Sequence, residues 1–328
     1  MATIKFWGVR GSVAAPITAD DVSQKVLTAL QAFHASLKTG NLSPEKFLES
    51  LPFSVRGTIG GNTSCVEVRC GDERICLDMG TGMRPFGNSL FPQMFENGGL
   101  TVTVLLSHVH WDHIQGLPFF GPLHINKETG IKNRWNFYGG TDWMSTAEAC
   151  LRGQMDAPEF PVSWQEIKRA THEINASSVC DMMGFHVGAV KVKTRKLHHP
   201  QETYGWRIEY DGKVIAYSTD NEPYDPSCPD PRLLELAEGA DVWITDCQYT
   251  KEMYEGKVGG VARHGWGHSY PEAVAETARR AGVKKTVLFH HDPASDDNKV
   301  LEIVEMCKGL VGVGQEVVAA YEGMEIAL

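Results

Sequence analysis

The chain has 328 residues, of which 42% are apolar and 22% are charged, and its formal net charge is −10. This length and composition indicate a globular protein of one large or two ordinary domains, and the negative charge disfavours a long nucleic-acid track. No segment offers the ~18 uncharged apolar residues of a membrane helix, and no secretory signal is recognised at the start. The eight cysteines form no CxxC pair, which disfavours a thiolate zinc site. We therefore expect a cytoplasmic protein outside the membrane.

Strand-like and helix-like runs alternate along the chain, which predicts an α/β layered fold. The first strand is expected at Ile4–Gly8. A hairpin is expected between Thr63–Cys70 and Glu73–Asp78, across the turn Gly71-Asp72. The apolar run Leu100–Ser107 (LTVTVLLS) predicts a buried strand, and it ends directly before a cluster of histidines.

Residues 16–57 are expected to form a helical insertion between the early strands. Apolar residues recur there at helical spacing, namely Val22, Val26, Leu30, Phe33 and Leu37. Ser43-Pro44-Glu45 opens a second short helix, with serine at the cap and proline at the first position. Two interpretations stay open, a packed surface subdomain and a lid over the active site.

The second half of the chain continues the alternation. A hairpin is expected between Gly205–Tyr210 and Lys213–Thr219, across Asp211-Gly212. The later expected elements are a helix from Pro231 to near Gly239, a strand Val242–Thr245, a helix from a capping box at Ser269–Glu272 to Gly282, a strand Thr286–Phe289, a helix Asp297–Leu310 and a final segment Glu316–Ala320. Chemically interesting residues therefore stand just past strand ends, where loops on a rigid scaffold carry function.

Three imidazoles and one carboxylate lie within six residues, in the run Ser107-His-Val-His-Trp-Asp-His113. His108 and His110 are two residues apart, so their side chains share one side of an extended segment. Asp112 and His113 follow as the chain turns. One metal ion cannot readily use all four groups, whereas two adjacent ions can. Nitrogen and carboxylate ligands suit zinc and also manganese or iron, so the sequence predicts two divalent metal ions.

Further ligands must come from later in the chain, and the candidates again follow expected strands. They are His198-His199 after Val190–Leu197, Asp220 after Lys213–Thr219, and His290-His291-Asp292 after Thr286–Phe289. Taken singly, each candidate fits a ligand and an ordinary surface residue equally well.

The HxHxDH motif, followed by Ile114–Pro118, resembles the metallo-β-lactamase superfamily, and the resemblance covers nearly the whole chain. It implies a four-layer αβ/βα sandwich, an α/β fold that forms one hydrolase domain over residues 1–328 from two similar halves.

The resemblance also implies roles for individual residues. His108, His110 and His199 would hold the first metal ion, Asp112, His113 and His290 would hold the second, and Asp220 would bridge both. His198 and His291 rival their neighbours. His199 is preferred because it precedes Pro200, and His290 is preferred because it comes first after its strand.

Within the superfamily, the chain resembles the ribonuclease Z and cyclic-nucleotide phosphodiesterase branch. The segments that carry this resemblance are Trp7–Ser12, Gly60–Cys65, Asp78–Gly82 and Tyr204–Arg207. Gly267-His268-Ser269 resembles a motif whose histidine is catalytic in ribonuclease Z, and Asp246 stands where that branch places a carboxylate partner. His268 is therefore expected to protonate the leaving group.

Two departures from ribonuclease Z lower the expectation of tRNA processing. Asp246 replaces a glutamate, and the segment between His113 and His199 contains no Gly/Pro-rich basic arm. A redox diiron role is disfavoured because His110 stands where the oxygen-reducing members carry glutamate.

We therefore expect a binuclear metal-dependent phosphodiesterase that acts on a small phosphodiester, such as a cyclic nucleotide. The alternatives are an endonuclease that matures RNA 3′ ends, a lactonase or thioesterase, and a non-catalytic metal-binding accessory protein. The partner is expected to be this small molecule, with nucleic acid disfavoured. The sequence leaves the oligomeric state open, including a homodimer.

Overall fold

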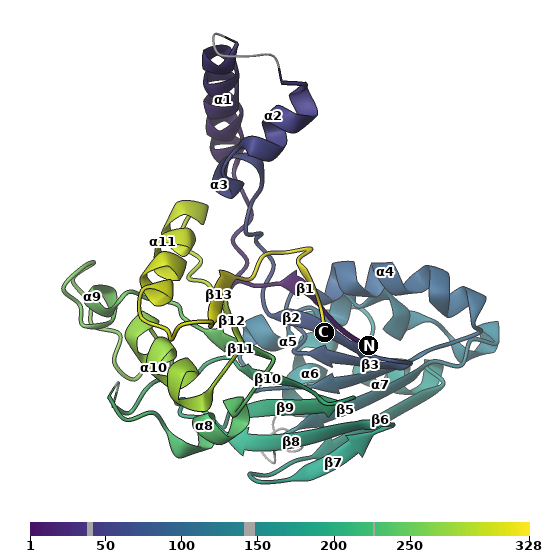
Figure 1. Cartoon of the computed structure of the whole chain (residues 1–328). Helices are drawn as coiled ribbons and strands as arrows, with labels where there is room; N and C mark the ends of the chain where they lie inside the picture. Colours follow the sequence, from purple (N-terminus) through teal and green to yellow (C-terminus); the bar gives the residue numbers. More distant parts are fainter. Residues whose placement is uncertain (38–41, 141–147, 226) are drawn as a thin grey trace.

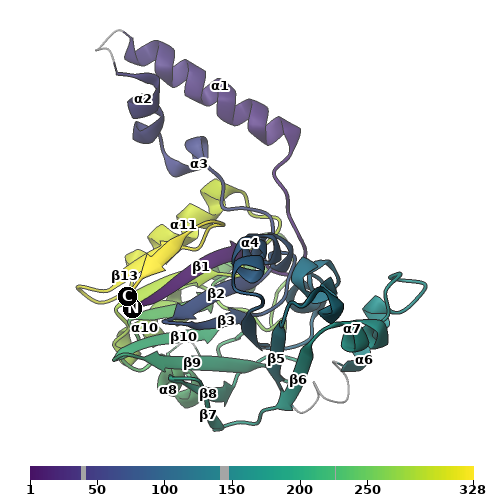
Figure 2. The ribbon, with the colours of Figure 1, turned by 90° about the vertical axis from the view of Figure 1, so that its right-hand side faces the viewer.

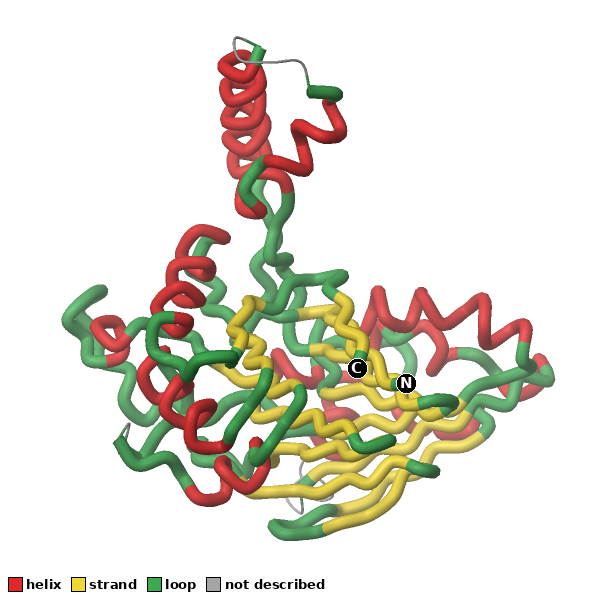
Figure 3. Tube along the Cα trace, viewed as in Figure 1, coloured by secondary structure: helices red, strands yellow, loops and turns green. Residues whose placement is uncertain are grey.

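The protein folds as two mixed β-sheets that face each other, with helices on both outer sides (Figures 1 and 3). The computed structural model describes residues 1–37, 42–140, 148–225 and 227–328. Among these residues, each sheet contains seven strands. This arrangement is the four-layer αβ/βα sandwich that the sequence predicts.

The first sheet is built from the N-terminal half of the chain and one C-terminal strand. Its order is β14-β1-β2-β3-β4-β5-β6. The strands are β1 (Ala2–Gly8), β2 (Cys65–Cys70), β3 (Glu73–Leu77), β4 (Thr101–Leu105), β5 (Arg134–Gly139), β6 (Glu173–Ser178) and β14 (Glu325–Ala327). Strands β3 to β6 run parallel, whereas β14, β1, β2 and β3 pair antiparallel.

The second sheet likewise has a parallel part and an antiparallel part. Its order is β13-β12-β11-β10-β9-β8-β7, with β10 to β13 parallel and β7 to β10 antiparallel. The strands are β7 (Gly184–Val187), β8 (Val190–Lys196), β9 (Tyr204–Tyr210), β10 (Lys213–Ser218), β11 (Val242–Asp246), β12 (Lys285–Phe289) and β13 (Glu316–Ala319). The carboxyl ends of parallel strands meet at one edge of a sheet, where α/β proteins commonly bind ligands.

Three apolar layers hold the sandwich together. Alternate residues of β1 such as Ile4 and Phe6 are fully buried and pack between the sheets with Trp206 and Phe289 of the facing strands. The outer face of the first sheet is near α4 (Met83–Glu96), α5 (Trp111–Ile114), η1 (Leu117–Phe119), η2 (Gly121–His124), η3 (Lys127–Thr129), α6 (Glu148–Met155) and α7 (Trp164–Ala170). The second sheet is flanked by α8 (Pro231–Ala237), α9 (Lys251–Tyr254), α10 (Pro271–Ala281) and α11 (Asp297–Lys308).

The predicted helical insertion contains three helices, α1 (Ala19–Ser36), α2 (Pro44–Ser50) and α3 (Phe53–Arg56). They form an arm that projects away from both sheets (Figures 1 and 2). Nothing in α1 is buried, and four of the five apolar residues expected to face a core are exposed by 46–60%, namely Val22, Val26, Leu30 and Leu37. These four side chains are about half exposed, whereas the ring of Phe33 packs on that of Phe47 in α2 with centroids 5.1 Å apart. In the described part of the chain, no helix is long and apolar enough to span a membrane.

Candidate metal centre

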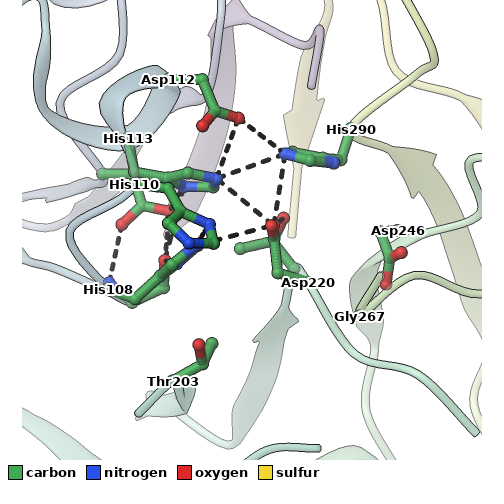
Figure 4. Close-up of polar contacts among 12 residues, drawn as sticks. His108, His110, Asp112, His113, Thr203, Asp220, Asp246, Gly267 and His290 are labelled. Atoms are coloured by element: carbon green, nitrogen blue, oxygen red, sulfur yellow. Dashed lines mark hydrogen bonds and ion pairs between the residues drawn. The ribbon is translucent and has the colours of Figure 1, made fainter. Parts of the chain in front are cut away.

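Polar side chains from four loops gather at the carboxyl ends of the parallel strands (Figure 4). The loops follow β4, β8, β10 and β12. They bring together all seven residues predicted as metal ligands: His108, His110, Asp112, His113, His199, Asp220 and His290. Both sheets contribute, so the centre forms only when the two halves pack against each other.

The first cluster consists of His108, His110, His199 and Asp220, whose candidate ligand atoms all lie within 4.8 Å of one another. Nδ1 of His110 lies 2.9 Å from Nε2 of His108 and 3.3 Å from Nε2 of His199. On its other side, Nδ1 of His199 lies 3.2 Å from the carbonyl oxygen of Gly267 and donates to it. A neutral imidazole that donates through one nitrogen keeps a lone pair on the other, so Nε2 of His199 is available to a metal ion.

The second cluster consists of Asp112, His113 and His290, all of them buried. Nε2 of His290 lies 3.0 Å from Oδ2 of Asp112 and 3.2 Å from Nε2 of His113. The short helix α5 begins just after His110, and it turns Asp112 and His113 toward this cluster. The contiguous motif thereby supplies both clusters.

Asp220 lies between the two clusters and offers one oxygen to each. Its Oδ2 is 3.6 Å from Nε2 of His108, while its Oδ1 is 3.3 Å from Nε2 of both His113 and His290. Figure 4 shows the carboxylate between the ring of His290 and the histidines of the HxHxDH motif. This is the geometry expected of a bridging carboxylate.

A buried carboxylate behind the centre, Asp78, fixes the orientation of His113. It lies 2.8 Å from Nδ1 of His113 and accepts hydrogen bonds of 2.7 Å from the backbone N–H of Ser107 and from the Tyr217 hydroxyl. A carboxylate that holds the far nitrogen of a ligating histidine sets its tautomer and increases its basicity. In the sequence Asp78 belongs to a family-like turn, and no local pattern there signals this role.

The electrostatics of the site favour cations. Burial lowers the pKa of His108 and lowers that of His199 to about 4, so both imidazoles stay neutral and can offer a lone pair. Burial would also lower the pKa of His113, but the carboxylates of Asp112 and Asp220 outweigh it and raise this pKa. The neutral imidazoles direct lone pairs into the site, and the carboxylates favour positive charge there. Both properties fit a site for divalent metal ions.

The two rival histidines have other partners. Nδ1 of His198 donates to the carbonyl oxygen of Glu222 over 2.8 Å, and its ring stacks on Tyr224 with centroids 3.6 Å apart. Nε2 of His291 donates to the carbonyl oxygen of Ala320 over 3.0 Å in a buried position. In each adjacent pair, the other histidine, His199 or His290, lies in a cluster of candidate ligands.

His268 lies beside the second cluster, on the loop before α10. Its ring stacks on that of His290 with centroids 5.0 Å apart, and its nitrogen lies within 4.8 Å of candidate atoms of His290 and Asp220. Nδ1 of His268 is 3.3 Å from Oδ2 of Asp246, close enough for an ion pair but not aligned as a hydrogen bond. Burial would lower the pKa of His268, but Asp246 and Asp220 outweigh it and raise this pKa, which favours the protonated form.

The predicted capping box at Ser269–Glu272 is wrong. The helix α10 begins at Pro271, its N-cap is Tyr270, and no described side chain caps it. The backbone N–H of Ser269 instead donates to Oδ2 of Asp246 over 2.9 Å. A tertiary contact with a buried carboxylate has replaced the local cap, so Asp246 holds His268 from the following residue as well as at its ring.

Residues near the N-terminus close the site on its outer side, a role that sequence analysis missed. The backbone N–H of Ser12 donates to Oδ2 of Asp112 over 2.7 Å. A Cβ atom on Gly11 would lie 2.4 Å from Nδ1 of His290, so only glycine fits against that ring. These residues belong to the family-like segment Trp7–Ser12, and that pattern was the available signal.

Comparison with known proteins supports one family. A sequence-family model described as a beta-lactamase superfamily domain matches residues 73–291. Ribonuclease BN of Escherichia coli is 25% identical over 264 residues, which cover 65% of this chain and 78% of that protein. The metallo-β-lactamase fold protein YhfI from Bacillus subtilis has a TM-score of 0.63 at 15% identity, with all of both chains covered. Unliganded yeast PDE1 has a TM-score of 0.63 at 13% identity and covers 100% of this chain and 99% of its own.

Proposed function

Because the chain belongs to the beta-lactamase superfamily, we propose that it hydrolyses phosphodiester bonds in a small substrate such as a cyclic nucleotide. Members of this superfamily are metal-dependent hydrolases and include phosphodiesterases and nucleases. We further propose that the seven gathered residues hold two divalent ions, with zinc preferred over manganese or iron, and that Asp220 bridges them.

The position of His268 carries the choice of a phosphodiester over other substrates. An alkoxide that leaves phosphorus is strongly basic and needs a proton as the bond breaks. His268 lies next to Asp220 and His290, and the carboxylates around it favour its protonated form. A donor in this position is of less use to a lactonase or β-lactamase.

In the proposed reaction, different residues of this chain orient the metal ligands and donate the proton. Two bound divalent ions would supply an activated water and neutralise charge on the phosphoryl oxygens. Asp78 orients His113, and the N–H of Ser12 orients Asp112. Nδ1 of His268 faces Asp246, which leaves its Nε2 to deliver the proton to the departing oxygen.

A second candidate function is RNA 3′-end cleavage. The similarity to ribonuclease BN over 264 residues favours it. The net charge of −10 opposes it, because binding to RNA backbone depends on basic surface. We therefore rank it below a small phosphodiester.

A substrate panel tests the proposed function. Bis(p-nitrophenyl) phosphate, p-nitrophenyl phosphate, a lactone and a β-lactam should be assayed with zinc and with manganese. We expect the diester to be cleaved faster than the monoester, because the monoester carries an extra negative charge and lacks the second ester arm. Asp220→Ala should abolish the activity and serves as the control for the metal site. Preference for the lactone or the β-lactam would contradict the proposal.

A further inference from the structure

The loop that carries His268 is fixed in an unusual way. We define the His268 loop as residues 263–269. It contains Gly265 and Gly267, both with positive φ (76° and 86°), and the side chains of His264 and Trp266 are exposed. The ring of His268 packs on that of His290, but the exposed first half of this loop buries little apolar surface, so backbone hydrogen bonds help to fix the segment that leads to His268.

Glu222 anchors the loop backbone directly before His268. The residue is only 5% exposed, and both of its carboxylate oxygens accept hydrogen bonds from the loop backbone. The N–H of Gly265 donates to Oε1 over 2.8 Å, and the N–H of Gly267 donates to Oε2 over 2.8 Å. The Tyr254 hydroxyl donates to Oε1 as well. A buried carboxylate that accepts three such bonds is held rigidly, since bonds to a charged acceptor are stronger than neutral ones.

The anchor completes a clamp around His268. On one side Glu222 binds the N–H of Gly267, and on the other side Asp246 binds the N–H of Ser269 over 2.9 Å. These N–H groups belong to the residues directly before and after His268. Two buried carboxylates therefore fix the backbone on both sides of one histidine.

The clamp is joined to the metal centre through two short connections. Glu222 follows the bridging residue Asp220 by two positions, and the intervening Asn221 donates its N–H to Asp246 over 3.2 Å. The carbonyl oxygen of Gly267 accepts from Nδ1 of His199. The turn that carries the bridging carboxylate thus also sets the distance from that carboxylate to His268.

We propose that Glu222 is a positioning residue for proton donation by His268. By holding the backbone of Gly265 and Gly267, it keeps Nε2 of His268 where the leaving oxygen departs. The attacking water first releases a proton to solvent. As the resulting hydroxide oxygen bonds to phosphorus, the ester P–O bond breaks, and the proton of Nε2 passes to the leaving oxygen. The consequence for catalysis rests on the proposed function, whereas the clamp itself does not.

The variant that tests this role is Glu222→Gln. It keeps the size of the side chain, but its amide has only one acceptor oxygen, so it cannot accept hydrogen bonds from the N–H groups of both Gly265 and Gly267. The matched control is Glu252→Gln, which removes an exposed carboxylate that has no side-chain hydrogen bond or ion pair among the described residues. Tyr254→Phe removes one of the three donors to Glu222 and leaves both loop contacts, so its effect should be small. Metal content is measured in every variant.

The kinetic arm compares two leaving groups. Nitrophenolate, from bis(p-nitrophenyl) phosphate, needs little protonation, whereas the ribose alkoxide of 3′,5′-cyclic AMP needs it. General acid catalysis contributes ~10²–10⁴-fold, so partial misplacement of the donor should lower kcat on the cyclic nucleotide ~10-fold or more. We expect less than ~2-fold loss on the nitrophenyl ester and little change in KM, because proton donation acts in the transition state. Equal losses on both substrates, or no loss, would overturn the proposal.

The second arm needs no activity. Amide hydrogen exchange, followed by mass spectrometry of peptides that span residues 263–269, should be faster in Glu222→Gln and unchanged in Glu252→Gln. If the wild type cleaves no phosphodiester, the proposed function fails, and faster exchange with metal content preserved still supports the clamp. Unchanged exchange overturns the clamp even in an active phosphodiesterase. Should Glu222→Gln fail to fold, Glu222→Asp, which keeps the charge but is one methylene shorter, decides by the same two criteria.

Discussion

Asp220 and His290 share a backbone conformation that is rare for residues with side chains, with φ of 54° in both. Left-handed backbone costs free energy outside glycine and is maintained where the surrounding structure demands it, often at functional sites. Here it turns each side chain back from its strand end into the centre. Asp78, with φ of 60°, does the same behind His113.

Replacement of His268 by alanine should reduce turnover without removing the metal ions. Because His268 is proposed to donate a proton, the loss should be ~10²–10⁴-fold for an alkoxide leaving group and much smaller for nitrophenolate. Asp246→Asn should give the same pattern in weaker form, since it removes the group that orients the ring. Parallel kinetics on the two substrates, with metal analysis, checks both variants. Equal losses with metals retained would remove His268 from the donor role.

His291 should make folding sensitive to acid. Burial lowers its pKa to about 3 in the folded chain, against about 6.5 for an unfolded histidine. A depressed folded pKa contributes stability that is present above the unfolded value and is lost as the pH falls from ~6.5 toward ~3. Between pH 7 and pH 5 the loss should be about 2 kcal/mol.

Urea unfolding of His291→Gln and the wild type at both pH values measures this contribution. Glutamine does not titrate, and it can still donate to the carbonyl oxygen of Ala320. Between pH 7 and pH 5, the free energy of unfolding should therefore fall by about 2 kcal/mol less in the variant than in the wild type. An identical fall in both proteins would mean that His291 is not buried in its neutral form.

The seven residues that gather at the candidate centre could be picked out from the sequence because four of them form one contiguous motif and the other three follow recognisable strands. The choice of His199 over His198 relied on the family's His-Pro pattern, and the choice of His290 over His291 relied on the end of the preceding strand. Glu222 and Asp78 could not be assigned roles, because their partners lie far away in sequence.

Among the secondary-structure elements, the arm of α1 to α3 shows that the spacing of apolar residues can predict a helix without predicting what the helix packs against. The spacing of apolar residues predicts the helix α1, and Thr18 caps it with a capping box. The same spacing does not say what the apolar face contacts, and in the structure this face is exposed. At α10 the local pattern itself was misleading. Ser269–Glu272 has the sequence of a capping box, but the backbone N–H of Ser269 donates to the buried carboxylate of Asp246 instead.

Asp297, at the start of α11, attaches the arm to the body. Its Oδ2 accepts from Nζ of Lys25 on α1 over 2.7 Å, and its Oδ1 accepts from the N–H of Ile59 over 2.9 Å. Asp297→Ala should lower the free energy of unfolding by ~1–3 kcal/mol, because the buried N–H of Ile59 loses its partner. It should also speed proteolysis within the arm.

Denaturant unfolding and limited proteolysis measure these two effects, and the exposed Asp20→Ala on α1 serves as the control. The metal content should stay that of the wild type, since Asp297 contacts none of the proposed ligands among the described residues. An arm as resistant to protease in Asp297→Ala as in the wild type would show that other contacts attach it.

On the scale of the whole molecule, the two sheets have matching designs, each with an antiparallel half and a parallel half. The alternation of elements predicted an α/β fold, and the family-like motif predicted the four-layer form. The short edge strands β7 and β14 were not predicted, because three or four residues carry too weak a pattern.

The central claim is that two metal ions, bridged by Asp220, are needed for phosphodiester hydrolysis. Metal-free protein should be titrated with zinc while hydrolysis of bis(p-nitrophenyl) phosphate and bound zinc are both followed. Seven ligands exceed the needs of one tetrahedral site, so activity should reach its maximum at about two ions per chain. Asp220→Ala should lose occupancy of both sites together and remain inactive. Full activity with one ion per chain, or two ions fully retained in Asp220→Ala, would contradict the account.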